Sequence, residues 1–131
     1  MRLWLQQQIQ KRTNYSLGIN AEEKAKEILQ ALGFSILSSR YQVGHGLEAG
    51  EIDIIATNPE KKLLLFIEVK KRKTLSLAAE SIKQTQMKRI YYSAEIYLSK
   101  HTEFENFDCR FDAILFDDNF NYEYIENAWG L

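Results

Sequence analysis

The stretch that most constrains the fold is residues 50–72, GEIDIIATNPEKKLLLFIEVKKR, where two strand-like runs flank a short polar segment. Pro59 in that segment suits a turn and would disrupt a central strand. The second run, LLLFIEVK, is apolar except for Glu68 and Lys70, which is typical of a strand buried on both faces of a sheet. We therefore predict a hairpin whose second strand lies at the centre of the sheet.

The first strand of this hairpin carries two acidic residues, although acidic side chains are poor strand formers. Alternation along a strand sends Glu51 and Asp53 to one face, and Ile52 and Ile54 to the other. Charged groups in a buried sheet are costly unless they are paired. The acidic face is therefore a candidate functional surface.

The second strand places Glu68 and Lys70 on one face. If the turn occupies residues 59–62, Asp53 lies directly opposite Glu68, and Glu51 lies opposite Lys70. Directly opposed Cβ atoms are about 4.5–5.5 Å apart, and like charges at that distance destabilise a hairpin. This register brings two carboxylates within reach of one divalent ion.

A carboxylate pair of this kind suits a hard cation such as Mg²⁺ or Mn²⁺, which prefers oxygen ligands. Asp53 and Glu68 would bind the ion, with the backbone carbonyl of Val69 as a further ligand. A bound ion lowers the pKa of a coordinated water and neutralises charge on a phosphate, and Lys70 could orient that water or stabilise the transition state. These groups suit phosphodiester hydrolysis. The alternative is an exposed sheet face on which Glu51 and Lys70 form an ordinary cross-strand ion pair.

The rest of the chain predicts an α/β fold with a mixed sheet flanked by helices. Asn20 caps the first helix and Gly33 ends it. The expected elements are a helix over 21–32, strands over 34–43, 51–57 and 63–72, a helical region over 77–101 that could begin with a separate short turn, and strands over 109–116 and 122–129. The order is α-β-β-β-α-β-β. Residues 18–131 are expected to form a single domain, and residues 1–17 a flexible or frayed arm.

Charge is unevenly distributed, although the net charge is only −1. Residues 61–100 contain ten Lys and Arg and three Glu, whereas residues 101–131 contain one Arg and eight Asp and Glu. A basic middle segment can face a polyanion, and simple solvation of a helix face is an alternative of equal weight. The candidate phosphate contacts are Lys71, Arg72, Lys73, Lys83, Lys88 and Arg89.

Other classes of protein are disfavoured by the composition. No run approaches the roughly 18 apolar residues of a membrane helix, and the first residues lack the pattern of a secretory signal. The single cysteine, Cys109, excludes a disulfide within the chain. We expect a cytoplasmic protein whose partner is nucleic acid, most simply DNA, and not a membrane.

The charged residues of the hairpin resemble the PD-(D/E)xK nuclease pattern, in which an Asp on one strand precedes an ExK triplet on the next. More narrowly, the chain resembles the bacterial YraN-like family, which is related to archaeal Holliday-junction resolvases. The resemblance covers nearly the whole chain. The matching motifs are Gly18-x-x-Ala21-Glu22-x-x-Ala25, Gly50-Glu51-Ile52-Asp53, Phe66-Ile67-Glu68-Val69-Lys70-x-Arg72, Ala94-x-x-Tyr97-Leu98, Arg110-Phe111-Asp112 and Asn127-Ala128-Trp129.

The resemblance implies a restriction-endonuclease-like fold and a Mg²⁺-dependent nuclease site. Asp53 and Glu68 would be metal ligands, Lys70 the catalytic lysine, and Glu22 the first-helix glutamate that completes the acidic cluster. From the residues alone, Glu22 is also a favourable first-turn residue for the helix dipole. Glu51 suits ligation and pairing with Lys70 equally well.

Two departures from the family pattern bear on function. The loop VGHGLEAG, residues 43–50, is longer than usual, and Gln86 stands where the family has a lysine. Gln86 is an accessory candidate, and Lys83, Lys88 and Arg89 are near enough in sequence to replace a phosphate contact.

The expected activity is that of a structure-selective DNA endonuclease in repair or recombination. Resolvase relatives act as dimers, so the resemblance allows a homodimer, and the sequence leaves the oligomeric state open. One alternative is a non-catalytic nucleic-acid-binding accessory module on the same fold. Another is a protein-interaction domain whose acidic C-terminal segment faces a basic partner.

Overall fold

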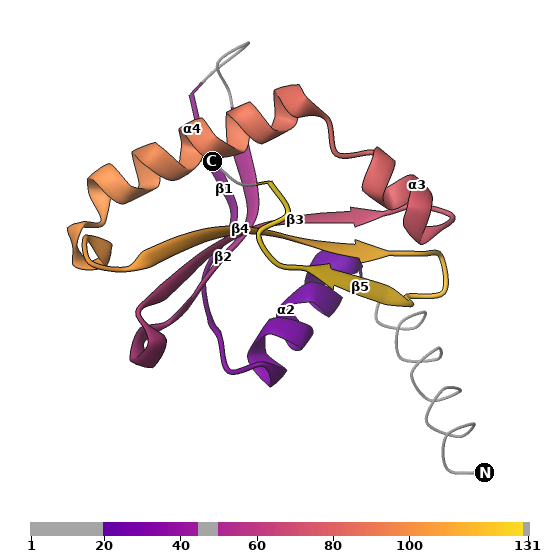
Figure 1. Cartoon of the computed structure of the whole chain (residues 1–131), viewed down its shortest axis with the longest axis horizontal. Coiled ribbons are helices and arrows are strands. Elements are labelled where there is room, and N and C mark those ends of the chain that lie inside the picture. Colours follow the sequence, from indigo (N-terminus) through magenta and orange to yellow (C-terminus); the bar gives the residue numbers. More distant parts are fainter. Residues whose placement is uncertain (1–19, 45–49, 130–131) are drawn as a thin grey trace.

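The computed structural model describes residues 20–44 and 50–129. Its elements are α2 (Ala21–Ala31), β1 (Ser35–Val43), β2 (Gly50–Asn58), β3 (Leu63–Lys71), α3 (Leu75–Glu80), α4 (Gln84–Lys100), β4 (Asp108–Phe116) and β5 (Tyr122–Ile125), with 3₁₀ turns at Pro59–Lys61 and Thr102–Phe104. The five strands form one mixed sheet in the order β1–β2–β3–β4–β5, with α4 across one face and α2 on the other (Figure 1).

This is the predicted α/β class with a helix-flanked mixed sheet. The observed order is α-β-β-β-α-α-β-β, because the helical region between β3 and β4 is divided into α3 and α4. The predicted arm over residues 1–17 and most of the loop before β2, residues 45–49, lie outside the described residues. Among the described helices, none is both long and apolar enough to cross a membrane.

Helix α2 begins and ends as its sequence predicts. The Asn20 side chain accepts a hydrogen bond from the Glu23 backbone N–H at 3.0 Å, which satisfies one free donor of the first turn. Gly33 follows the last turn with a φ of 95°, a left-handed conformation that costs glycine no steric strain. Ala25 and Leu29 are fully buried and fix this helix against the sheet.

The hairpin of β2 and β3 has the predicted register, with Asn58 paired to Leu63 and Ile54 paired to Ile67. The Asn58 side chain caps the 3₁₀ turn at Pro59–Lys61 that joins the strands. β3 is the middle strand of the sheet, its residues 64–68 are buried, and it pairs in parallel with β4. The prediction of a central second strand is confirmed.

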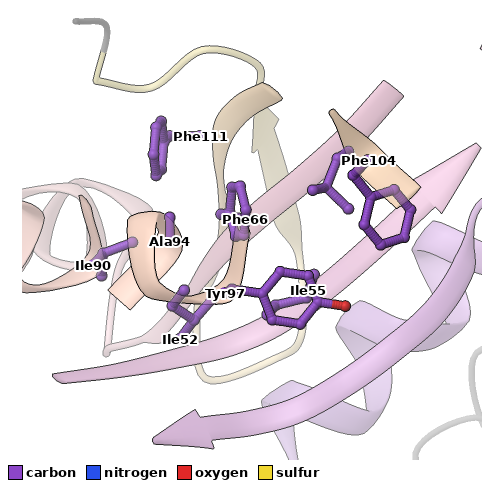
Figure 2. Close-up of a cluster of buried hydrophobic side chains, with 9 residues drawn as sticks. Ile52, Ile55, Phe66, Ile90, Ala94, Tyr97, Phe104 and Phe111 are labelled. Atoms are coloured by element: carbon purple, nitrogen blue, oxygen red, sulfur yellow. The ribbon is translucent and has the colours of Figure 1, made fainter. Parts of the chain in front are cut away.

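Two apolar layers hold the sheet between its helices. The layer under α4 joins Phe66 on β3 with Ile90 and Tyr97 on α4, and the rings of Phe66 and Tyr97 meet edge to face with centroids 6.1 Å apart (Figure 2). The layer under α2 joins Leu29 with Ile67 on β3. Because β3 contributes to both layers, charged residues at its end are held in a well-packed frame.

One irregularity interrupts the alternation of side chains along β2. Ile52 packs in the layer under α4, whereas Ile54 packs in the layer under α2, so the prediction that they share a face is wrong. Between them lies Asp53, and the register of β1 with β2 brings Arg40 opposite Asp53. Arg40 has a left-handed φ of 52°. Alternation depends on an extended backbone, and it is broken at this point.

The fully buried Asp112 links β4 to β5 and to the segment after it. Arg110, on the same strand, lies with its Nε 2.9 Å from Asp112 Oδ1 and supplies the opposite charge. Asp112 is fully buried, and it also accepts hydrogen bonds from the Tyr124 hydroxyl at 2.6 Å and the Asn127 backbone N–H at 2.9 Å.

Candidate metal centre

The candidate centre lies where β2 and β3 separate. Their pairing extends only to Ile54 and Ile67. In place of the next ladder hydrogen bond, Asp53 Oδ2 accepts a hydrogen bond from the Val69 backbone N–H at 2.8 Å. The N–H and C=O of one strand residue point toward the same neighbour, so the Val69 carbonyl is directed toward this opening as well. The predicted neighbours Asp53 and Glu68 meet here.

Glu68 is almost fully buried, with 2% of its surface exposed. Its Oε1 lies 3.2 Å from Lys70 Nζ and accepts a hydrogen bond from Gln86 Nε2 at 2.8 Å. The structure thus brings Gln86, at the start of α4, onto the same carboxylate as the predicted lysine. Both donors fix the orientation of the Glu68 side chain.

The predicted cross-strand ion pair between Glu51 and Lys70 is wrong. Lys70 pairs with Glu68 on its own strand, and Glu51 Oε2 accepts a hydrogen bond from Gln42 Nε2 at 3.3 Å. The reason is that the β2–β3 ladder ends before the two residues could face each other. Glu51 lies instead toward α2 and β1.

The electrostatics of the Asp53–Glu68 pair favour an added positive charge. Burial, and then the charge of Asp53, raise the pKa of Glu68 to about 8, although Lys70 opposes this shift. Burial likewise raises the pKa of Asp53, against the hydrogen bond from Val69. When both acids are ionised beside one lysine the group carries a net negative charge, so a proton or a cation stabilises the pair.

A second group of carboxylates adjoins the first. Glu22 from the first turn of α2 and Glu51 from β2 join Asp53, with one oxygen of each within 4.8 Å of the others. This places the predicted Glu22 beside Asp53. All the side-chain atoms that could bind a metal here are carboxylate oxygens, which suit a hard divalent cation such as Mg²⁺ or Mn²⁺. The residues present therefore fit such an ion.

The predicted phosphate contacts are dispersed. Arg89 lines a cavity of about 340 Å³ together with Gln86 and Glu51, beside the carboxylates. Lys88 lines a different cavity of about 390 Å³ with Trp129. Lys71 lies 3.5 Å from Asp118 Oδ1 and over the Phe120 ring. The other five, Arg72, Lys73, Lys83, Lys88 and Arg89, are exposed.

Sequence reasoning missed two residues of this region, Arg40 and Gln42. Arg40 Nε donates a hydrogen bond to Glu22 Oε2 at 2.9 Å, across 18 residues of sequence. Arg40 and Gln42 both lie on β1, and polar residues in such a strand indicate only an exposed edge of the sheet. No local sequence pattern predicts a left-handed arginine within a strand. Only the pairing of β1 with β2 and the position of α2 bring them to the carboxylates.

The sequence of residues 21–116 matches the uncharacterised protein family UPF0102. A UPF0102 protein of Azorhizobium caulinodans is 38% identical over 121 residues, which cover 92% of this chain and 88% of that protein. UPF0102 proteins of Bradyrhizobium diazoefficiens and Nitrobacter winogradskyi are 41% and 40% identical over 101 residues, which cover 77% of this chain and 71% and 80% of theirs. The family match runs from the start of α2 to the end of β4 and contains every residue of the candidate centre.

Proposed function

The chain belongs to the uncharacterised protein family UPF0102, and we propose that it is a metal-dependent nuclease that hydrolyses phosphodiester bonds. The observation that carries the proposal is the meeting of Asp53 and Glu68 where β2 and β3 separate, with Lys70 Nζ 3.2 Å from Glu68 Oε1. The raised pKa of both acids means that the pair favours a cation.

In this proposal Asp53 and Glu68 hold Mg²⁺ or Mn²⁺, with the Val69 carbonyl and Glu22 as further ligands. Such an ion supplies a water of lowered pKa and neutralises charge on a phosphate when it is bound. Lys70 is already held at Glu68, so its ammonium group can stabilise negative charge on the phosphate next to the ligands. Gln86 keeps the Glu68 carboxylate in place by its hydrogen bond.

The finer form of the proposal is a structure-selective DNA endonuclease of PD-(D/E)xK type with a restriction-endonuclease-like fold. In this form of the proposal, the backbone of the bound DNA would lie along Arg89 and the basic residues that follow β3. Two copies of the protein would form a homodimer that makes paired cuts. The support is the resemblance of the hairpin motifs together with the order of helices and strands. The cavity that Arg89 shares with Glu51 and Gln86 lies beside the acids.

A second candidate function is a non-catalytic nucleic-acid-binding module. One observation favours it: Lys70 and Gln86 already satisfy Glu68 Oε1, so part of the buried charge is neutralised by the chain itself. Binding of nucleic acid that is unchanged by EDTA, with no cleavage in Mn²⁺, would support this candidate.

The test is a cleavage panel of four-way junction, flap, linear duplex, single-stranded DNA and RNA, each in Mg²⁺ and in Mn²⁺. We expect cleavage by the wild type that is lost by at least about a hundredfold in Asp53→Ala and Lys70→Ala, and Mn²⁺ binding in calorimetry that Asp53→Ala removes. Glu60→Ala, an exposed acid in the hairpin turn, is the matched control and should behave as wild type. Metal-dependent cleavage that survives Asp53→Ala would refute the assignment of this site.

A further inference from the structure

Arg40 combines a strained backbone with a position at the acidic cluster. It is one of the few described non-glycine residues with a positive φ, at 52°, a conformation that is sterically unfavourable for an ordinary L-residue. Its neighbours Ser39 and Tyr41 pair with Ile54 and Ile52, so Arg40 falls opposite Asp53. The left-handed backbone therefore interrupts the regular strand at the residue opposite Asp53.

The guanidinium of Arg40 contacts one carboxylate of the cluster and lies within electrostatic range of the other two. Its Nε lies 2.9 Å from Glu22 Oε2. The hydrogen bond and charge of Glu22, followed by the charges of Glu51 and Asp53, raise the pKa of Arg40. The positive charge of Arg40 thus interacts with three acids from two different elements, and its direct contact is with Glu22.

The ion pair between Arg40 and Glu22 can separate easily. The Arg40 side chain is 62% exposed, whereas that of Glu22 is 21% exposed. Ion pairs with an exposed partner contribute little to stability. The guanidinium can therefore move into solvent at low cost, while Glu22 remains held at the cluster by its helix.

We propose that Arg40 is an exchangeable counterion of the Glu22–Glu51–Asp53 cluster. Its guanidinium neutralises Glu22 when no divalent cation is bound and gives up that carboxylate when one enters. Arg40 then sets the cation affinity of the centre, because every binding event must displace one positive charge. The inference rests on the proposed function only in requiring that the cluster binds a divalent cation.

The test is Mn²⁺ binding, measured by calorimetry on the wild type and on Arg40→Asn in the absence of nucleic acid. Asparagine tolerates the left-handed conformation, so this change removes the charge and keeps the backbone. We expect Arg40→Asn to bind Mn²⁺ about five- to tenfold more tightly, since a unit charge close to the ion is removed. The same difference should appear as a larger rise of Tm on addition of Mn²⁺.

Lys62→Asn is the matched control. Lys62 is also basic, exposed and left-handed, with a φ of 49°, and it lies at the other end of the hairpin, roughly 17 Å from Asp53 at about 3.3 Å per strand residue. Its substitution should leave the Mn²⁺ affinity within about twofold of the wild type. Arg40→Lys, which keeps the charge, should bind Mn²⁺ more weakly than Arg40→Asn.

The outcomes separate this inference from the proposed function. Equal Mn²⁺ affinity in the wild type and in Arg40→Asn would overturn the counterion role and leave the metal centre standing. An equal gain in Lys62→Asn, or in Arg40→Lys, would also overturn it, because the effect would then not come from a charge at this position. Folded wild type and variants that all fail to bind Mn²⁺ would refute the metal centre itself.

Discussion

Glu68 offers a test at the scale of one residue. Burial and the charge of Asp53 raise its pKa from 4.5 to about 8, so between these pH values the folded protein binds more protons than the unfolded chain. The free energy of unfolding falls with rising pH wherever the folded state binds more protons. We therefore expect the contribution of Glu68 to stability to be complete below pH 4.5 and to be lost as the pH rises through about 8.

The measurement is urea unfolding in EDTA at several pH values between about 6 and 9, for the wild type and for Glu68→Gln. Glutamine mimics the protonated acid and cannot titrate, so this variant should lose most of the pH dependence. Added Mn²⁺ should also reverse the trend, because a bound ion replaces the proton and binds more tightly at higher pH. A wild type and a Glu68→Gln variant with parallel pH profiles would contradict the raised pKa.

At the scale of elements, Gly50 sets the distance between β2 and α4. A Cβ atom at this position would overlap with Ser93 Oγ and lie 2.9 Å from the Arg89 carbonyl oxygen. We expect Gly50→Ala to destabilise the protein by about 1–3 kcal/mol, as overpacking does in a tight contact. Since α4 also carries Gln86, the variant should weaken Mn²⁺ binding as well.

The partner change Ser93→Ala is the informative companion to Gly50→Ala. It removes the nearest clashing atom but not the Arg89 backbone oxygen, so the double variant should recover part of the lost free energy of unfolding in urea titrations. A double variant as unstable as the sum of the two single changes would show that the helix, and not the serine side chain, sets the limit.

The link between β4 and β5 depends on Asp112. This fully buried carboxylate holds Arg110, the Tyr124 hydroxyl and the Asn127 backbone N–H. Asp112→Asn should cost about 3 kcal/mol, because it removes the closer counter-charge of a partly buried guanidinium and leaves only the exposed Glu126 at 3.7 Å. Asp118→Asn, at an exposed pair with Lys71, should change stability by less than about 1 kcal/mol. Similar losses of unfolding free energy in the two variants would contradict this account of Asp112.

At the scale of the whole molecule, the features that local sequence determines were predictable. Asn20 and Gly33 bound α2 as expected, since caps depend on neighbouring residues. The turn at Pro59–Lys61 fixed the register of β2 and β3, and a register follows from turn length and the apolar pattern. The identity of the central strand followed from the apolar run of β3.

The contacts that the sequence did not reveal are those set by distant elements. Lys70 was expected at Glu51 and lies at Glu68, because the two strands separate beyond the predicted ladder. Gln86 reaches Glu68 from a helix that packs across the sheet, and Arg40 reaches Glu22 through strand pairing and helix placement. Predictions from the alternation of residues along a strand assume a regular extended backbone. The candidate metal centre lies where β1 and β2 depart from that geometry.

The irregular course of β1 also bears on how copies of this protein behave in a crowded solution. Among the described strands, β1 and β5 form the two edges of the sheet, and an open edge offers unpaired N–H and C=O groups as a template for aggregation. The register shift between Ile36 and Ser38 and the left-handed Arg40 interrupt one edge, and the other has only four residues. Neither edge is suited to extension by a second chain, and the backbone that presents Arg40 also disfavours edge-to-edge association.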